Sequence, residues 1–519
     1  MNTTFTKIIL ILTFSFFIST LSLAQLNPQQ IDSLVEDAMQ KFNVVGTSIA
    51  IVKDGKVYYN KGFGLKDIDK KEKVDINTQF CIASNSKAFT TTALSILVED
   101  GKLKWTDKVR DYIPKFKMYN AYVTENFNIL DLLTHRSGLG LGAGDLMIFP
   151  DGSNFTIDDI AQNFQYMKPQ SPFRTKYDYD NLLYLIAGDI IRKTSGMSWE
   201  EFIEEKILSP LKMEHTVSGI NLLKSKEDLS SPHATVDGKN HSIEQYQQMI
   251  NGAAAGIYST SEDMTKWMLM HLNHGKYGDN NSLISQASQN KMWRIHTVTE
   301  VNRNPRYNSH FAGYGLGFEL TDVKGNMKVS HTGGMPGMLS KVIMIPDMDL
   351  GIVILTNTSD GGALLFETVS NSIVDAYLGL DNFHWIEKYY AYIQNRETET
   401  KLIVANVWET VKKADSKSIN QNNFIGTYRD AWFGNIEIYL KNNHLWFKSE
   451  RSPKLNGSMQ LYKANTFAIK WEYQDMNADA FAIFSLDENG KAQGLSMKGI
   501  SPDIDFSFDF QDLDFKRVE

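Results

Sequence analysis

The positions of the predicted strands along the sequence constrain the fold most, because the strands lie far apart in the chain. Residues 47–52 and 57–62 read as two strands joined by Asp54-Gly55, since Asp-Gly supplies the positive φ of a tight hairpin. Further strand patterns lie at 314–320, 327–330, 341–345 and 351–356, the last pair around the turn 346–349. Helical patterns dominate from 87 to about 211. We therefore predict an α+β fold: an antiparallel sheet flanked by helices, with an all-helical insertion.

The length of the chain predicts more than one domain. At 519 residues it exceeds what a single core usually supports. An amphipathic helix is expected first, because Ile31, Val35 and Phe42 belong to an apolar pattern at helical spacing. The charged stretch 382–420 reads as a helical linker.

The last hundred or so residues have the alternating pattern of strands. Ile436, Ile438 and Leu440 alternate with polar residues, and an apolar alternation returns through 504–510. Asn489-Gly490 marks another tight turn. This region is predicted to form a small all-β, barrel-like domain.

The N-terminus has the features of a secretory signal. A short polar start is followed by an apolar run at 8–18 and by the small residues Ser22 and Ala24. The run is too short for a spanning helix, so we expect cleavage after Ala24 and an exported protein, periplasmic or secreted, without a stable membrane anchor. Cys81 is the single cysteine, so no intramolecular disulfide is available for stability.

A Ser-x-x-Lys tetrad at Ser84 and Lys87 is the strongest chemical signal. Residues three apart on a helix share a face, so the amine can reach the hydroxyl and act as the base that a serine nucleophile needs. A second copy at Ser288 and Lys291 lies in a polar, amide-rich stretch. Lys87 instead precedes an apolar helical pattern that would bury its stem, which favours the first copy.

Two further motifs can complete an acyl-transfer site. Tyr179-Asp180-Asn181 precedes an apolar helical run and offers a second proton shuttle. A similar Tyr-x-Asn at 58–60 falls inside the first predicted hairpin. His331-Thr332-Gly333-Gly334 ends a predicted strand, where glycines let a substrate approach and a backbone N–H can face an oxyanion.

These three motifs, in this order, resemble those of the serine β-lactamases and penicillin-binding proteins, especially the class C branch. Supporting segments are Leu132–Leu139, Pro210–Met213, Ala255–Met264 and Tyr314–Phe318. The resemblance implies a β-lactamase and transpeptidase-like fold. We expect a signal peptide at 1–24, a catalytic domain at 25–381, a helical linker at 382–420, and a small all-β domain at 421–519 that resembles the lipocalin-like domain of some members.

The resemblance also implies a role for each motif residue. Ser84 would be the nucleophile, Lys87 its activating partner and Tyr179 the proton shuttle to the leaving group and the deacylating water. Asn181 would hold the substrate amide, and the backbone N–H groups of Ser84 and Gly334 would form the oxyanion hole. Whether Lys87 or Tyr179 removes the serine proton stays open.

His331 departs from the resemblance, because efficient β-lactamases usually carry lysine there. Histidine is mostly neutral above a pKa of about 6.5 and attracts a substrate carboxylate less than lysine does. Similar proteins with His-x-Gly include esterases and D-amino-acid peptidases. We therefore predict a serine hydrolase of small amides or esters, with a class C-like β-lactamase and a non-catalytic sensor or scaffold as alternatives.

Other functions receive little support from the sequence. A net charge of −8 without a basic run argues against a nucleic-acid partner. Neither H-E-x-x-H nor a cysteine cluster indicates a metal, and no cofactor is expected. The glycines at 138–144 lack phosphate-loop spacing, and Ser84 has no G-x-S-x-G elbow. The predicted partner is a small-molecule or peptide substrate, and the sequence is compatible with a homo-oligomer.

Overall fold

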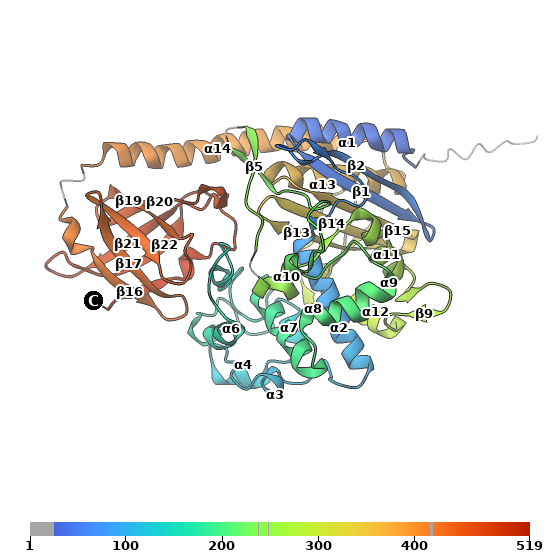
Figure 1. Ribbon diagram of the computed structural model, residues 1–519, viewed down its shortest axis with the longest axis horizontal. Helices are drawn as coiled ribbons and strands as arrows, with labels where there is room; N and C mark the ends of the chain where they lie inside the picture. The colour runs from blue at the N-terminus through green and yellow to red at the C-terminus, as the bar shows by residue number, and fades with distance from the viewer. Residues whose placement is uncertain (1–24, 237, 248, 416–418, 519) are drawn as a thin grey trace, which may run out of the picture.

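A computed structural model describes residues 25–236, 238–247, 249–415 and 419–518. The expected signal peptide, residues 1–24, lies outside them. The described residues form a sheet with helices on both faces and, beside it, a β-barrel (Figure 1). The fold is therefore the predicted α+β arrangement followed by a small all-β domain.

Nine of the described strands form one antiparallel sheet, in the order β10-β11-β12-β13-β14-β15-β1-β2-β3. Their bounds are β1 Gly46–Lys53, β2 Lys56–Asp67, β3 Glu72–Lys73, β10 Thr297–Val298, β11 Ala312–Tyr314, β12 Glu319–Val323, β13 Asn326–Met335, β14 Met338–Ile345 and β15 Leu350–Thr356. Strands β1 and β15, from opposite ends of this region, pair centrally from Thr47↔Thr356 to Lys53↔Leu350. The sheet thus joins early and late segments, as the spacing of the strand patterns predicts.

The sheet has an apolar core on each face. Helices α1 (Pro28–Phe42) and α13 (Asp360–Tyr377) cover one face, where Val35 and Val369 pack against strand residues such as Ile352. Helix α11 (Ser261–Leu272) covers the other face, through contacts with β1 and β15. Both faces of the central strands are buried, which explains why β15 is buried at every position.

Helices dominate the region between β4 (Phe80–Cys81) and β7 (Tyr258–Ser259), two strands that pair with each other. The helices are α2 Ser86–Glu99, α3 Val109–Tyr112, α4 Ala121–Asn126, α5 Ile129–Leu132, α6 Ile157–Asn163, α7 Leu182–Ser195, α8 Trp199–Ile203, α9 Ser209–Leu211 and α10 Gly252–Ala255. Two short hairpins and one helix accompany this region and the return of the chain to the sheet. They are β5–β6 (His233–Val236 with Lys239–Ser242), β8–β9 (Lys276–Tyr277 with Asn281–Ser282) and α12 (Gln286–Met292). Helices α2, α7 and α10 pack together at its centre.

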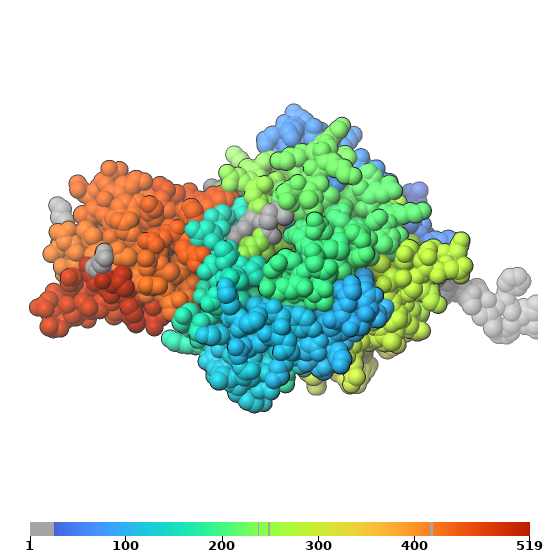
Figure 2. Space-filling model, turned by 60° about the horizontal axis from the view of Figure 1, so that its bottom comes forward, coloured from blue at the N-terminus to red at the C-terminus, as the bar shows by residue number. Residues whose placement is uncertain are grey.

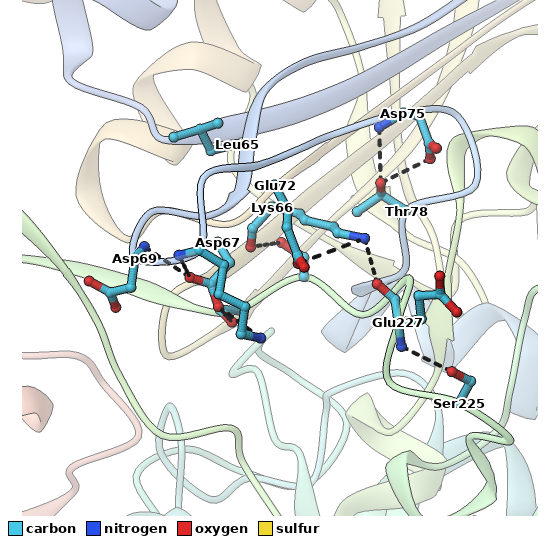
Figure 3. Close-up of polar contacts among 12 residues, drawn as sticks. Leu65, Lys66, Asp67, Asp69, Glu72, Asp75, Thr78, Ser225 and Glu227 are labelled. Carbon is cyan, nitrogen blue, oxygen red and sulfur yellow. Dashed lines mark hydrogen bonds and ion pairs between the residues drawn. The ribbon is translucent and has the colours of Figure 1, made fainter.

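Polar contacts fix the connection from β2 to β4 (Figure 3). The Lys66 ammonium lies between the Glu72 carboxylate and the Glu227 carbonyl oxygen. The Asp67 carboxylate accepts from two backbone N–H groups, and Thr78 bonds to Asp75. This connection leads directly into β4, so it holds the approach to Ser84 in place.

The sequence prediction of a single strand at 314–320 was wrong. β11 ends at Tyr314 and β12 begins at Glu319, with a turn between them. Gly317 has φ +79 in that turn, and a Cβ there would lie only 2.9 Å from the Cα of Ala88. Gly317 therefore packs against the start of α2 in a turn, while the Phe318 ring lies against His271 and Trp293.

The C-terminal region forms a closed barrel from eight described strands, β16 to β23 in sequence order. They are β16 Gly426–Asp430, β17 Gly434–Lys441, β18 His444–Ser449, β19 Asn456–Lys463, β20 Thr466–Trp471, β21 Ala480–Leu486, β22 Ala492–Gly499 and β23 Asp514–Arg517. Large buried side chains, including Tyr428, Phe447, Trp471, Phe484 and Phe515, fill the centre. A filled centre favours a structural or contact role for the barrel over an internal ligand site.

Helix α14 (Trp385–Lys413) links the two parts and runs along both (Figure 1). Its first turn buries Trp385 and Ile386. Near its end, Val407 and Val411 pack against Ala468 and Phe481 on the outside of the barrel. The charged linker predicted from the sequence is thus a helix that contacts both the sheet region and the barrel.

The strand predicted from the alternation at 504–510 was also wrong. Between β22 and β23 the chain makes turns and a short 3₁₀ helix, Phe510–Asp512. Phe508 and Phe510 stack at the end of the barrel, with ring centroids 6.0 Å apart. Phe506 instead lies against the ring of Tyr179, so the alternation reflects contacts with two different parts of the molecule.

The barrel docks on the helical region (Figure 2). Arg451 of the barrel donates to Asn154 and Asp159, and Asn163 donates to the carbonyl of Trp432. Lys454, in the same connection between β18 and β19, forms an ion pair with Glu244. Polar contacts of the barrel therefore reach two separate segments of the preceding domain.

None of the helices in the described part of the chain has an apolar stretch of the length needed to span a bilayer.

Candidate active site

Ser84 lies where the chain turns from β4 into α2. A 3₁₀ turn, η1 (Ala83–Asn85), connects the two, and Ala83 before the serine has φ +46. A non-glycine residue in this left-handed region costs about 1–2 kcal/mol. Ser84 is partly exposed although its neighbours from Phe80 onward are buried. The turn thus presents one hydroxyl at a helix N-terminus, where free N–H groups favour negative charge.

Lys87 places its amine against Ser84. The Lys87 Nζ lies 3.0 Å from the Ser84 Oγ, 2.7 Å from the Asn181 Oδ1 and 3.1 Å from the carbonyl oxygen of Ala254. The last two oxygens only accept hydrogen bonds. In the neutral amine they take both N–H groups, so the lone pair faces the Ser84 hydroxyl.

Burial sets the protonation of Lys87. Its side chain is fully buried, and desolvation lowers the pKa of the amine from 10.5 to about 7. The nearby Asp145 and Asp180 favour the charged form but only partly offset burial. At neutral pH a large fraction of Lys87 is therefore an unprotonated base.

Asn181 connects Lys87 to a buried carboxyl group. It stands at the start of α7, and its Nδ2 donates to the Asp145 Oδ2 at 2.7 Å. Burial raises the pKa of Asp145 well above its usual value, and Asp180 adds to that rise. Both ends of the Asn181 amide are thus engaged by described residues, which leaves the second Nδ2 hydrogen for the predicted contact with a substrate amide.

Tyr179 lies beside the lysine. The Lys87 Nζ is 4.8 Å from the centre of the Tyr179 ring, and the His135 ring packs on the tyrosine at 4.2 Å. Burial raises the pKa of Tyr179 well above 10, although the nearby Ser84 hydroxyl acts in the opposite direction. Tyr179 is therefore a neutral phenol in the resting site.

His331 is neutral, and its tautomer follows from its partners. Burial lowers the pKa of His331 to about 3, with the Lys87 charge contributing. Its Nδ1 lies 2.5 Å from the carbonyl oxygen of Thr332, which can only accept, so Nδ1 carries the proton. The Nε2 at 2.9 Å then accepts from the Tyr314 hydroxyl. His331 supplies no positive charge to the site.

The end of β13 lies open beside Ser84. Residues 331–335 pair with β14 alone among the described strands, because β12 pairs only as far as Ser330. Gly333 packs so closely on η1 that a Cβ would lie 2.1 Å from the carbonyl oxygen of Ile82. Thr332 and Gly334 are accessible on this free edge. The structure thus brings together Ser84 and the predicted His331–Gly334 strand.

The duplicate motifs lie elsewhere. Ser288 on α12 donates its hydroxyl proton to the Glu99 carboxylate, and Asn60 on β2 bonds to Glu262. Neither belongs to the Ser84 network. Among the described residues no group of three or more His, Cys, Asp or Glu side chains is arranged to hold a metal ion.

Three residues of the network were absent from the sequence prediction: Asp145, His135 and Tyr314. His135 and Tyr314 lie within segments that supported the family resemblance, so those segments gave an indirect signal. The His135 Nδ1 accepts a hydrogen bond from the backbone N–H of Asp180, and this bond helps to hold the segment that carries Tyr179. Asp145 begins a short 3₁₀ helix, Asp145–Met147, and no sequence pattern marks it.

The fold and this constellation define a β-lactamase and transpeptidase-like architecture. The sequence model of the beta-lactamase family matches residues 31–368. The chain therefore belongs to the beta-lactamase family. A second model, of a domain of unknown function, matches residues 410–517.

Two curated relatives illustrate the range of the family. The chain is 30% identical to Protein flp of Staphylococcus aureus (strain MW2) over 67% of its own length and 66% of that protein. It is 27% identical to the unguisins hydrolase ungD' of Aspergillus campestris over 74% of its own length and 71% of that protein. The chain thus spans slightly less than two thirds of the length of Protein flp.

Solved structures share the fold. The octameric penicillin-binding protein homologue from Pyrococcus abyssi superimposes with a TM-score of 0.59 at 21% identity, over 94% of this chain and all of that one. The penicillin-binding protein from Bacillus halodurans gives a TM-score of 0.53 at 21% identity, over 65% of this chain and 98% of that one. These similarities establish the architecture at low sequence identity.

Proposed function

We propose that the protein is a serine hydrolase that forms an acyl-enzyme at Ser84 on small amide or ester substrates. The observation that carries this proposal is the Lys87 amine, 3.0 Å from the Ser84 Oγ, with its other two hydrogen bonds going to acceptor-only oxygens. This geometry, together with a pKa near 7, provides a general base at physiological pH.

Acylation begins with proton transfer from Ser84 to Lys87. The serine oxygen attacks the substrate carbonyl carbon, and negative charge develops on the carbonyl oxygen. The backbone N–H groups of Ser84 and Gly334 are the proposed donors to that oxyanion, one at a helix N-terminus and one on the free edge of β13. Lys87 is favoured over Tyr179 as the first base because the resting phenol is protonated.

Tyr179 is proposed to deliver a proton to the leaving group. Its hydroxyl is buried, and its ring contacts both the Lys87 amine and the Phe506 ring. The departing amine or alcohol takes the phenolic proton, and Lys87 restores it. Water then attacks the acyl-enzyme with the same groups acting in reverse, which returns Ser84 to its free form.

The neutral His331 shapes the proposed substrate class. A β-lactamase attracts the carboxylate of its substrate with a cation at this position, whereas His331 carries none. Small peptides of D-amino acids and esters therefore fit the site better than β-lactams do. The relative ungD' is named a hydrolase, which agrees with hydrolytic chemistry in this family.

Export is part of the proposal. We propose that residues 1–24 direct secretion to the periplasm or the medium, and that residues 25–381 form the catalytic domain, followed by the linker and the barrel domain at 421–519. N-terminal sequencing of the protein recovered from the source cells would locate the cleavage site. A retained Met1 on the exported or membrane fraction would contradict this part.

Hydrolysis rates over a panel of p-nitrophenyl esters, D-aminoacyl amides and β-lactams test the function. We expect turnover of esters or D-aminoacyl amides and weak or no turnover of β-lactams. Ser84→Ala should lower kcat/KM by roughly a thousandfold or more. Ser288→Ala is the matched control, because it alters the other Ser-x-x-Lys copy, and should retain the wild-type rate. A folded wild-type protein that turns over no member of the panel would contradict the proposal.

A further inference from the structure

The barrel sends one segment into the catalytic region. Residues 500–513 leave the barrel after β22 and return at β23. Asp503 in this segment accepts from Arg396 and Thr400 on α14, while Phe510 stacks on Trp471 inside the barrel. The segment is therefore anchored at several points, and its contacts with the active site are held in place.

Asp509 of this segment forms hydrogen bonds with the backbone on both sides of Asp145. Its carboxylate accepts the backbone N–H of Gly144 at 2.7 Å and that of Leu146 at 3.0 Å, the two residues on either side of Asp145. Asp509 is fully buried. The Ser507 hydroxyl contacts the Asp145 carboxyl as well. Two side chains of the barrel thus fix the position of one catalytic-domain residue.

Hydrogen bonds continue from this loop to the nucleophile. Asp145 accepts from Asn181, Asn181 accepts from Lys87, and Lys87 bonds to the Ser84 oxygen. Displacing the loop would move Asp145 and leave the Asn181 amide free to turn. The Lys87 amine would then lose an acceptor that orients its lone pair, and the nearby carboxyl that favours its charged form would shift.

We propose that Asp509 is a positioning residue of the active site, through which the C-terminal barrel sets the orientation and the basicity of Lys87. This inference rests on the proposed function. A buried carboxyl that bonds only to backbone N–H groups would by itself affect stability alone, through the two donors left unpaired on its removal. Asp509 differs because its two bonds bracket the residue that begins the chain Asp145–Asn181–Lys87–Ser84.

The test compares full-length Asp509→Ala and Asp509→Asn with Asp487→Ala. Asp487 is the matched control, because this barrel aspartate also accepts two backbone N–H groups, from Asn489 and Lys491, within the turn between β21 and β22. The measurements are kcat, KM, the pH profile of kcat/KM and hydrogen exchange of residues 142–147. Asn can still accept one of the two N–H bonds and serves as the conservative variant, should the alanine variant fail to fold.

We expect Asp509→Ala to lower kcat at least tenfold with a smaller change in KM, to move the acid limb of the pH profile and to speed exchange at 142–147. Asp509→Asn should recover part of kcat, and Asp487→Ala should match the wild type. Unchanged kcat and pH limb in the Asp509 variants would overturn the proposal. If the wild type neither hydrolyses a substrate nor labels at Ser84, the proposed function fails. If hydrogen exchange at 142–147 is also unchanged in the Asp509 variants, the positioning role of Asp509 is overturned as well.

Discussion

At the scale of single residues, burial determines the chemistry of the site. The three hydrogen-bond partners of the Lys87 amine are uncharged oxygens. Desolvation therefore lowers the pKa of Lys87 by more than the attraction of Asp145 and Asp180 raises it. The same burial keeps Tyr179 protonated and His331 neutral. A lysine with a pKa near 7 beside a serine is the combination that general-base activation requires.

The pKa of Lys87 predicts how activity depends on pH. A base acts in its unprotonated form, and burial lowers the pKa of Lys87 to about 7. Activity should therefore be full above pH 7 and fall about tenfold per pH unit below it. The pH profile of kcat/KM with a neutral ester measures this limb. A profile flat from pH 5 to pH 8 would argue against Lys87 as the base.

Sequence reasoning reached the residues with motif spacing and missed those that depend on the fold. Ser84 and Lys87 are neighbours on one helical face, so their contact follows from the sequence alone. Tyr179, Asn181 and His331 were placed by resemblance, and the structure does bring them together. Asp145 and Asp509 have no local pattern, because their roles come from loops that meet only in the folded chain.

At the scale of elements, close backbone packing aligns Ser84 with the free edge of β13. Strand β13 lies directly on η1 because Gly333 has no side chain, and Asn85 reaches across to Ser340 on β14 at 2.8 Å. The Ser340 hydroxyl donates in turn to the carbonyl of Ile82. The serine turn and the free edge of β13 thus form one rigid unit.

Two neighbouring glycines provide a matched test of this packing. A Cβ on Gly333 would meet the Ile82 oxygen at 2.1 Å, whereas one on Gly334 meets only the Leu339 Cδ2 at 3.4 Å. We expect Gly333→Ala to lower the free energy of unfolding by about 1–3 kcal/mol and to reduce kcat strongly. Gly334→Ala should change the free energy of unfolding little. Urea unfolding and ester hydrolysis measure both effects, and equal stability of the two variants would disprove the close-packing argument.

The element predictions failed where an apolar pattern had more than one cause. The alternation at 504–510 is typical of a strand, yet Phe510 fills the barrel end while Phe506 faces Tyr179. At 314–320 the apolar residues pack around the tight turn at Gly317. An apolar pattern in the sequence indicates which residues are buried. It does not indicate which part of the molecule buries each of them, and that is visible only in the folded chain.

At the scale of the whole molecule, the barrel reaches the candidate site through Phe506. The Phe506 ring lies 5.9 Å from the Tyr179 ring, edge to face, and it packs on Gly142. The backbone N–H of Gly142 donates to the Tyr179 carbonyl. Because Phe506 remains 40% exposed beside Tyr179, a substrate of the proposed site would have an apolar surface from the barrel to contact.

Gly142 provides the test of this contact. It has φ +70, and a Cβ there would lie 2.7 Å from the Phe506 carbonyl oxygen. Gly142→Ala should therefore displace residues 500–510 and speed their hydrogen exchange. Gly140→Ala is the control, because its Cβ meets only the flexible Gln170 side chain, at 3.1 Å. Protection of residues 500–510 that stays at the wild-type level in Gly142→Ala would mean that the barrel segment does not depend on this contact.

The central claim is that Ser84, activated by Lys87, becomes acylated. Incubating the full-length protein with a fluorophosphonate probe and locating the adduct by peptide mass spectrometry tests it most directly. The account predicts one adduct, on the peptide containing Ser84, that Ser84→Ala abolishes, Lys87→Met greatly slows and Ser288→Ala leaves intact. No adduct on the folded protein, or an adduct on a different residue, would contradict it.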